Sequence, residues 1–95
     1  MGTRLTVSGQ VQGVGFRPTV WRLAHEMGLT GDVKNTGEGV VIRLWGNAAA
    51  KFPDRLHNEL PPLARIEKLD VEPLQEPAPT DFSICSSQEG EMRGN

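Results

Sequence analysis

The chain has 95 residues, which is enough for one small domain with a modest hydrophobic core. Ten basic against twelve acidic residues give a formal charge of -2 without a basic cluster, which argues against a nucleic-acid-binding surface. The single cysteine, Cys85, cannot form an internal disulfide. No apolar run is long enough to span a membrane, and the N-terminus lacks a secretory pattern. We therefore expect a cytoplasmic protein without membrane contact.

The first third of the chain predicts a strand, a loop and a helix. Apolar and polar residues alternate over about residues 3–12, which indicates a half-buried strand. From about residue 18 to 27 the apolar residues recur at helical spacing, and Gly28 is placed to end that helix. A glycine-containing loop therefore joins the strand to the start of the helix.

Two further strands, over Thr30–Asn35 and 40–45, are expected to form a hairpin. The intervening residues 35–39 are rich in Asn, Thr and Gly, which tolerate the backbone angles of a tight turn. A second helix is expected next, with Asn47 as its N-cap and Pro61 and Pro62 after its end. Pro53 fits poorly in a helix that starts at residue 48, so the helix begins later or its first turn is distorted.

The remaining segments predict a fourth strand over 64–73 and a short fifth strand over 81–85. Ile66 is out of phase with Leu69 and Val71, which favours a bulge or a later start of the fourth strand. We expect one domain over residues 1–86. Residues 87–95 are polar and contain glycine, so we expect a flexible tail or the start of a linker to further domains.

The order of these elements is typical of an α+β fold. Strand, helix, strand, strand, helix, strand is the βαββαβ pattern of ferredoxin-like sandwiches, in which two helices cover one face of an antiparallel sheet. The short C-terminal strand would be an addition to that sheet. Because this architecture carries many functions, the fold alone does not identify the activity.

The loop between the first strand and the first helix is a candidate phosphate site. Gly13 and Gly15 permit close approach of the backbone, and Pro18 suits a first helical turn. Free N–H groups at a helix start attract anions, and the planar guanidinium of Arg17 can hold two phosphate oxygens. The spacing matches neither a Walker loop nor a dinucleotide fingerprint, and an ordinary glycine turn with a surface arginine is the alternative.

Other polar residues give weaker signals. Asn35 by itself is more often a turn residue than a catalytic one. His25 and His57 have no partners at metal-ligand spacing, so we expect surface histidines, no metal and no cofactor. The pairs Arg22/Glu26 and Arg55/Glu59 are expected on solvated helix faces.

Several motifs together resemble the acylphosphatase family. They are VQGVGFR at 11–17, GLTGDVKN at 28–35 and GEG at 37–39, in that order along the chain. Arg-Pro at the end of the first motif and PPLARI at 61–66 resemble one branch of the family, the N-terminal acylphosphatase-like domain of the hydrogenase-maturation carbamoyltransferases (HypF). On this resemblance, the chain is one domain of a longer protein.

The resemblance implies hydrolysis of an acyl phosphate to a carboxylic acid and inorganic phosphate. For the HypF branch it implies carbamoyl phosphate as the substrate. In the family, the loop amides and an arginine bind the phosphoryl group and an asparagine positions the attacking water, without a metal. Partners implied are downstream domains of the parent protein and hydrogenase-maturation proteins. Asp32 stands where stand-alone members often have an aromatic residue, and it could alter the packing of the pocket. These family roles fall on Arg17 and Asn35 as catalytic residues and on Gln12, Gly13, Val14, Gly15, Phe16 and Arg17 as the phosphate-binding loop.

Two other functions remain as alternatives. The same fold could serve as a non-catalytic module that binds phosphate or docks a neighbouring domain. An RNA-recognition module is disfavoured, because such modules stack bases on aromatic residues of the central strands. Here the strand over 40–45 offers only Trp45 and no basic face.

Overall fold

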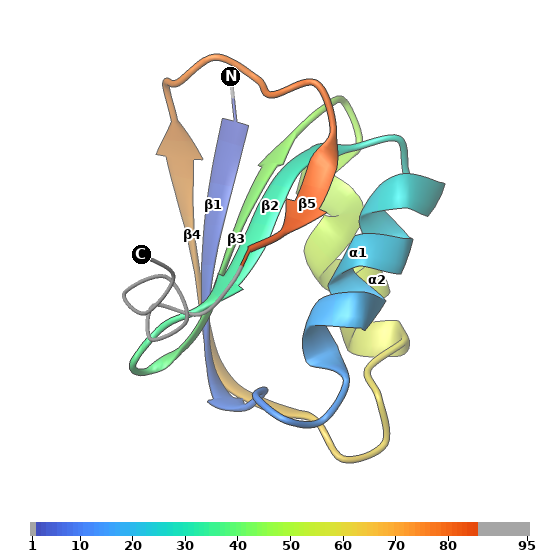
Figure 1. Ribbon diagram of the computed structural model, residues 1–95, viewed down its shortest axis with the longest axis vertical. Helices are drawn as coiled ribbons and strands as arrows, with labels where there is room; N and C mark the ends of the chain where they lie inside the picture. The colour runs from blue at the N-terminus through green and yellow to red at the C-terminus, as the bar shows by residue number, and fades with distance from the viewer. Residues whose placement is uncertain (1, 86–95) are drawn as a thin grey trace, which may run out of the picture.

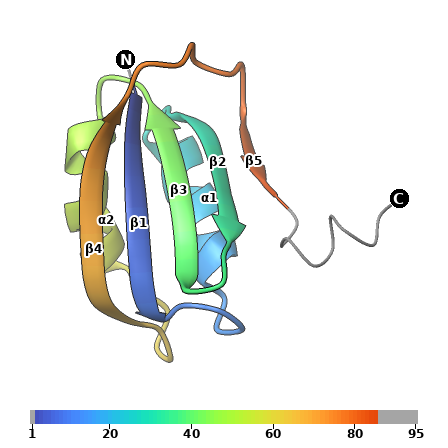
Figure 2. The same cartoon turned by 90° about the vertical axis from the view of Figure 1, so that its left-hand side faces the viewer.

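The computed structural model describes residues 2–85. Five strands form one sheet in the order β4-β1-β3-β2-β5, seen face-on in Figure 2. The expected tail over 87–95 lies outside the described residues. The strands are β1 (Gly2–Gln10), β2 (Thr30–Asn35), β3 (Gly39–Trp45), β4 (Arg65–Leu74) and β5 (Phe82–Ile84).

The predicted ferredoxin-like α+β fold is confirmed, with one difference in strand direction. Pairs β1–β3, β1–β4 and β2–β3 are antiparallel, whereas β5 lies parallel to β2. The chain leaves β4 at one end of the sheet and crosses that end before it enters β5 (Figure 1). Strand β5 therefore starts where β2 starts and runs alongside it, so the sheet is mixed.

Both helices, α1 (Phe16–Glu26) and α2 (Phe52–Asn58), cover the same face of the sheet (Figure 1). Apolar residues from alternate strand positions meet the apolar sides of the helices in one continuous core, as the periodicities of two and 3.6 residues require. The largest fully buried side chains in this core are Phe16, Phe52, Leu5, Leu23, Ile42, Leu44 and Leu56.

Helix α1 begins two residues before the expected start and ends as expected. Gly15, in the left-handed region with φ 80°, is its N-cap, so Pro18 falls within the first turn, where its missing N–H costs no bond. At the other end, Gly28 has φ 70°. Its N–H donates to the His25 carbonyl and the Leu29 N–H donates to the Ala24 carbonyl, which is the Schellman pattern.

The prediction that Asn47 caps the second helix is wrong. A 3₁₀ turn, η1 (Ala49–Lys51), precedes α2, and neither element has a side-chain cap. Pro53 lies in the first turn of α2, so the helix begins later than residue 48 and its entry is distorted, as the proline indicated. Because α2 starts at Phe52, Asn47 lies too far from its first N–H groups to cap them.

The phase slip in the fourth strand is a bulge. The register between β1 and β4 shifts between Ser8 and Gly9, so that Ser8 pairs with Lys68 and Gly9 with Ile66. One additional β4 residue, Glu67, is therefore accommodated opposite this step. The bulge moves Ile66 back onto the core, where it packs half-buried.

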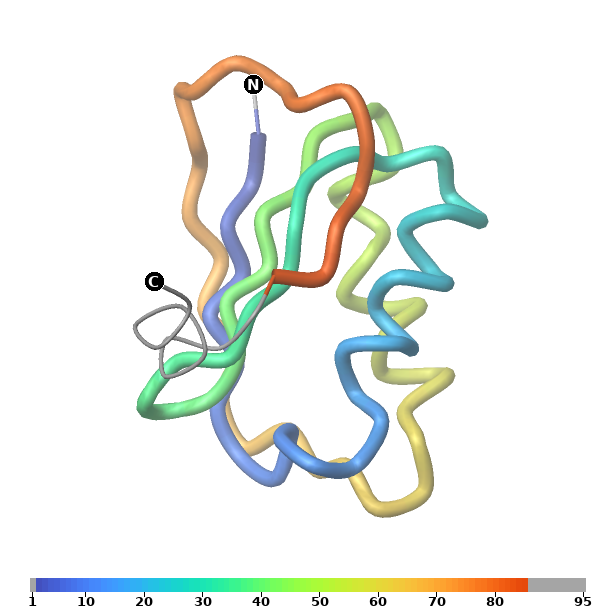
Figure 3. Tube along the Cα trace, viewed as in Figure 1, coloured from blue at the N-terminus to red at the C-terminus, as the bar shows by residue number. Residues whose placement is uncertain are grey.

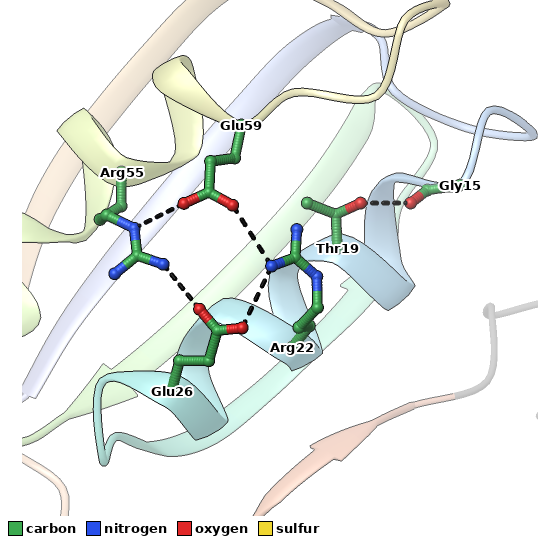
Figure 4. A network of polar contacts seen from close by, with 6 residues as sticks. All are labelled: Gly15, Thr19, Arg22, Glu26, Arg55 and Glu59. Carbon is green, nitrogen blue, oxygen red and sulfur yellow. Dashed lines mark hydrogen bonds and ion pairs between the residues drawn. The ribbon is translucent and has the colours of Figure 1, made fainter.

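Charged side chains connect the two helices across their outer surface. Arg22 and Glu26 on α1 form a closed ring with Arg55 and Glu59 at the end of α2 (Figure 4). The two pairs, which were expected on solvated helix faces, are thus joined in one network. The hydrogen bond from Arg55, followed by that from Arg22, holds the pKa of the Glu26 carboxyl below its usual value.

Candidate phosphate site

The carboxyl ends of β1, β2 and β5 lie at the same end of the sheet. Strands β1 and β2 both run antiparallel to β3, and β5 runs parallel to β2, so all three share one direction. The loop 11–15, Asn35 and Cys85 follow or end these strands. The tube in Figure 3 shows the β1–α1 loop and the β2–β3 turn at this common end.

The loop between β1 and α1 combines positive-φ glycines with N–H groups that are unpaired within residues 2–85. Gly13 and Gly15 have φ 74° and 80°, and a Cβ built on either would meet no heavy atom within 4 Å. Within the described residues, none of the N–H groups of residues 12–16 donates a hydrogen bond. Several unpaired donors thus lie beside open space at the start of α1, where the helix dipole favours negative charge.

Arg17 reaches from the first turn of α1 to the end of β5. Its Nη1 donates to the Cys85 carbonyl oxygen at 3.0 Å, and the Cys85 N–H donates to the Val33 carbonyl oxygen at 2.8 Å. These two hydrogen bonds position the guanidinium beside the ends of β5 and β2. The β2 residue in this chain of bonds, Val33, lies two residues before Asn35. Within residues 2–85 the Cys85 carbonyl is the one acceptor of the Arg17 guanidinium, and it occupies only part of the guanidinium's donor capacity.

Asn35 is the last residue of β2 and belongs to the helix-facing row. It pairs with Val40, which in turn pairs with Val7, and both of these neighbours are fully buried. Its Oδ1 is buried and accepts no hydrogen bond from any described residue. Buried amide oxygens nearly always have a partner, and a water molecule is a suitable donor for this one.

The side chains of residues 12, 14 and 16 of the predicted phosphate-binding loop contact the core or the β2–β3 turn. Phe16 is 1% exposed and fills the core beneath the loop, and Val14 packs half-buried against the same core. The Gln12 amide leaves the loop and contacts the β2–β3 turn. Of the predicted phosphate-binding residues, therefore, only Arg17 could contribute a side chain, and the others contribute backbone N–H groups.

A hollow of about 320 Å³ lies next to this loop, between the end of β1 and the β2–β3 turn. Among the predicted site residues, only Gln12 lines it. The hollow is therefore not lined by the Arg17 guanidinium or the Asn35 amide. Its lining residues are Gly9, Gln10, Val11, Gln12, Gly37, Glu38 and Gly39.

Asp32 does not reach the site. It alternates with Val33, so it lies on the sheet face opposite the helices, where it forms a two-pronged ion pair with Arg43 of β3. The hydrogen bond to Asp32 raises the pKa of Arg43 above its usual value. Asp32 and Asn35 thus project to opposite faces of the sheet, and an effect of Asp32 on the packing of the pocket stays a prediction.

Two contributors were not identified from the sequence. The Cys85 carbonyl, which holds Arg17, comes from backbone and leaves no mark in the residue type. Thr36 closes the β2–β3 turn by accepting from the N–H groups of Glu38 and Gly39. The second had a local signal, because Thr directly after a strand and before Gly is typical of such turns.

No group of three or more His, Cys, Asp or Glu side chains is arranged to hold a metal ion within residues 2–85. Over the same part of the chain, no helix is both long and apolar enough to cross a membrane.

Comparison with known proteins connects this geometry to a family. The chain is 46% identical over 87 residues to a carbamoyltransferase HypF from Rhizobium leguminosarum bv. viciae, a match that covers 92% of the chain and 12% of that relative. It is 41% identical over 85 residues to an acylphosphatase from Halorhodospira halophila, covering 86% of the chain and 91% of that relative. The chain thus spans only a small part of the HypF proteins that it matches.

Solved structures agree with these relatives. A full-length HypF in its phosphate- and nucleotide-bound form superposes with a TM-score of 0.86 at 30% identity, over 94% of this chain and 12% of that one. A family model described as Acylphosphatase matches residues 3–84, which include every strand and helix except the first residue of β1. With its loop, arginine and asparagine at one end of this sheet, the chain belongs to the acylphosphatase family.

Proposed function

We propose that this domain hydrolyses acyl phosphates, with Arg17 and Asn35 as its catalytic residues. The proposal is supported above all by one observation: the unpaired loop amides, the Arg17 guanidinium and the orphaned Asn35 oxygen all lie at the same end of the sheet. The phosphoryl group would bind the amides of residues 12–16 and the guanidinium. A water molecule held by the Asn35 amide would face the phosphorus.

The reaction needs little more than these groups. The water oxygen forms a bond to phosphorus, the bond from phosphorus to the acyl oxygen breaks, and the carboxylate leaves with the electron pair. Both protons of the water remain on the product, which is released as dihydrogen phosphate. Since a carboxylate is a good leaving group and the phosphoryl transition state is loose, positioning and charge stabilisation matter more than a strong base. The amide of Asn35 can orient water without repelling the phosphate dianion.

Phosphate release from benzoyl phosphate and carbamoyl phosphate tests the proposal. Arg17→Ala and Asn35→Ala should each lower kcat/KM by roughly 10²–10³, the usual cost of losing one preorganised group. Arg65→Ala is the matched control, because Arg65 is exposed on β4 and makes no side-chain hydrogen bond or ion pair within residues 2–85. Circular dichroism should show that all three variants are folded.

A different result would favour a binding module. If wild-type protein releases no phosphate, yet inorganic phosphate shifts the NMR amide signals of Gly13 and Gly15, the domain captures the anion without turnover. If neither occurs, the loop is not a phosphate site at all.

We further propose that the domain acts within a longer cytoplasmic protein of the HypF type, on carbamoyl phosphate and in hydrogenase maturation. The similarity to HypF proteins over 92% of the chain supports this assignment. Measuring kcat/KM for carbamoyl and benzoyl phosphate, with and without the downstream domains, tests it. A preference for carbamoyl phosphate that appears only in the longer protein would place substrate selection outside this domain.

A further inference from the structure

The side chain of Gln12 connects the phosphate loop to the turn that follows Asn35. Its Nε2 donates to the carbonyl oxygens of Thr36 and Gly39, both at 2.8 Å, across 24 and 27 residues of sequence. Both neighbours are acceptors, so only the NH₂ end of the amide fits between them. One side chain thus joins the loop to both ends of the turn.

The turn is internally closed, so it responds to this contact as one unit. The Thr36 N–H donates to the Gly39 carbonyl at 2.8 Å, and the Thr36 hydroxyl accepts from the N–H groups of Glu38 and Gly39. Asn35 immediately precedes this unit and pairs with Val40, which immediately follows it. Holding Thr36 and Gly39 therefore restrains the backbone of Asn35 from both sides.

Asn35 has little else to hold its side chain. The amide makes no hydrogen bond to any residue in the described part of the chain, and its Oδ1 is buried without a partner. Its orientation relative to the loop thus depends on the backbone that carries it. In addition to the ladder that joins β2 through β3 to β1, the pair of bonds from Gln12 links this backbone directly to the loop.

We propose that Gln12 is a positioning residue, which fixes the Asn35 amide relative to the phosphate held by the loop without itself contacting the phosphate through its NH₂ group. This inference rests on the hydrolase function proposed above. It differs from a phosphate-binding role for the Gln12 side chain, because the donors that would serve a phosphate are already engaged with two carbonyls.

The inference predicts a specific kinetic pattern for Gln12→Ala. The loop amides and Arg17 remain, so KM and the inhibition constant of inorganic phosphate should change by less than about threefold. The value of kcat should fall roughly 10- to 100-fold, because small displacements of a positioning group have large effects on rate. The Thr36 amide should exchange its hydrogen faster, since the turn has lost its tie to the loop.

Gln10→Ala is the matched control. Gln10 is the same residue type, lies two positions earlier and lines the same hollow, but its side chain makes no hydrogen bond within residues 2–85. It should keep kcat within twofold of wild type. Adding Gln12→Ala to Asn35→Ala should lower kcat less than Gln12→Ala does in the wild type, because the two residues act through one effect.

The possible results distinguish a failure of the positioning role of Gln12 from a failure of the proposed hydrolase function. If folded Gln12→Ala keeps its kcat, or if KM and the phosphate inhibition constant rise in proportion to the loss of activity, the positioning role is wrong while the hydrolase function stands. If wild-type protein releases no phosphate, both are overturned.

Discussion

Asn35 illustrates how a single residue can be poor for packing and well suited to chemistry. It stands in a row of buried valines, where an apolar side chain would fit, and yet it carries an oxygen with no described partner. An unpaired buried acceptor costs roughly 1–3 kcal/mol. Residues that disagree with their surroundings in this way are concentrated at functional sites.

A carboxylate at this position separates water positioning from proton abstraction. Asn35→Asp is expected to be no more active than Asn35→Ala at neutral pH, because a negative charge beside the phosphate dianion opposes binding. As the pH falls and the carboxyl becomes protonated, the activity of Asn35→Asp relative to wild type should rise. Phosphate release measured between roughly pH 4 and 8 checks this, because that range begins near the ordinary pKa of an aspartate. An Asn35→Asp variant that is faster than wild type at pH 7 would contradict the prediction.

At the scale of elements, α1 is specified at both ends by glycines with different tasks. Gly15 opens the helix next to the candidate phosphate site, and Gly28 closes it. A Cβ at Gly28 would meet no heavy atom within 4 Å, so its requirement is purely one of backbone conformation. Its effect on stability can therefore be isolated from packing.

Gly28→Ala should lower the free energy of unfolding by about 1–2 kcal/mol, because alanine resists the left-handed conformation. Gly37→Ala is the control, since Gly37 is equally open and has no positive φ. It should be neutral or stabilise the protein by about 0.4–1 kcal/mol through the unfolded chain. Urea denaturation measures both, and equal effects at the two positions would argue against the conformational explanation.

The charged ring between α1 and α2 predicts a pH-dependent contribution to stability. Hydrogen bonds from Arg55 and Arg22 hold the pKa of Glu26 below its usual value in an unfolded chain, so the ring stabilises the fold above that usual value. This contribution is lost as the pH falls through the folded-state pKa of Glu26. Glu26→Gln should therefore be slightly less stable than wild type at pH 7, and the difference should shrink as the pH falls into the acidic range where Glu26 is protonated.

Thermal melts at several pH values measure this difference. The effect should be small and should weaken in high salt, because the four side chains are partly exposed, at 34–48%. Glu67→Gln, on the exposed side of β4 and outside any described ion pair, should show no such pH dependence. A Glu26→Gln effect that persists at low pH would indicate a packing change and not an ionic one.

For the molecule as a whole, β5 links core stability to the candidate site. Phe82 is 3% exposed and belongs to the core, and three residues later the Cys85 carbonyl accepts from Arg17. This short strand thus closes one edge of the sheet and also positions the guanidinium. A substitution that loosens the packing of β5 in the core should therefore also displace the Cys85 carbonyl and with it Arg17.

Phe82→Ala is expected to lower the free energy of unfolding by about 3–5 kcal/mol. For a chain of this size the total is roughly 5–14 kcal/mol, so the variant should be partly unfolded when warmed. Below its melting temperature, its kcat/KM should still fall because Arg17 loses a fixed partner. Val71→Ala, an exposed position on the opposite edge strand, should change neither quantity by much. A fully active Phe82→Ala at low temperature would show that β5 does not position Arg17.

Local patterns in the sequence determined most of the elements. Alternation of apolar residues indicated the strands, helical spacing indicated α1, and Gly28 and Pro53 marked a helix end and a distorted helix start. Ile66 broke the alternation in β4, which indicated a bulge or a later strand start, and the structure has the bulge. These features depend on neighbours within a few residues, which is the range over which backbone preferences and periodicity act.

Only the tertiary structure decided how distant backbone segments meet. That β5 runs parallel to β2, that Arg17 reaches a carbonyl 68 residues away, and that Gln12 holds the β2–β3 turn all depend on the path of the whole chain. Backbone carbonyls are the same at every residue, so the amino-acid sequence carries no local mark of which one a side chain will contact. The loop and its arginine were therefore predictable as a motif, whereas the positioning of the loop, Arg17 and Asn35 relative to one another follows from the fold.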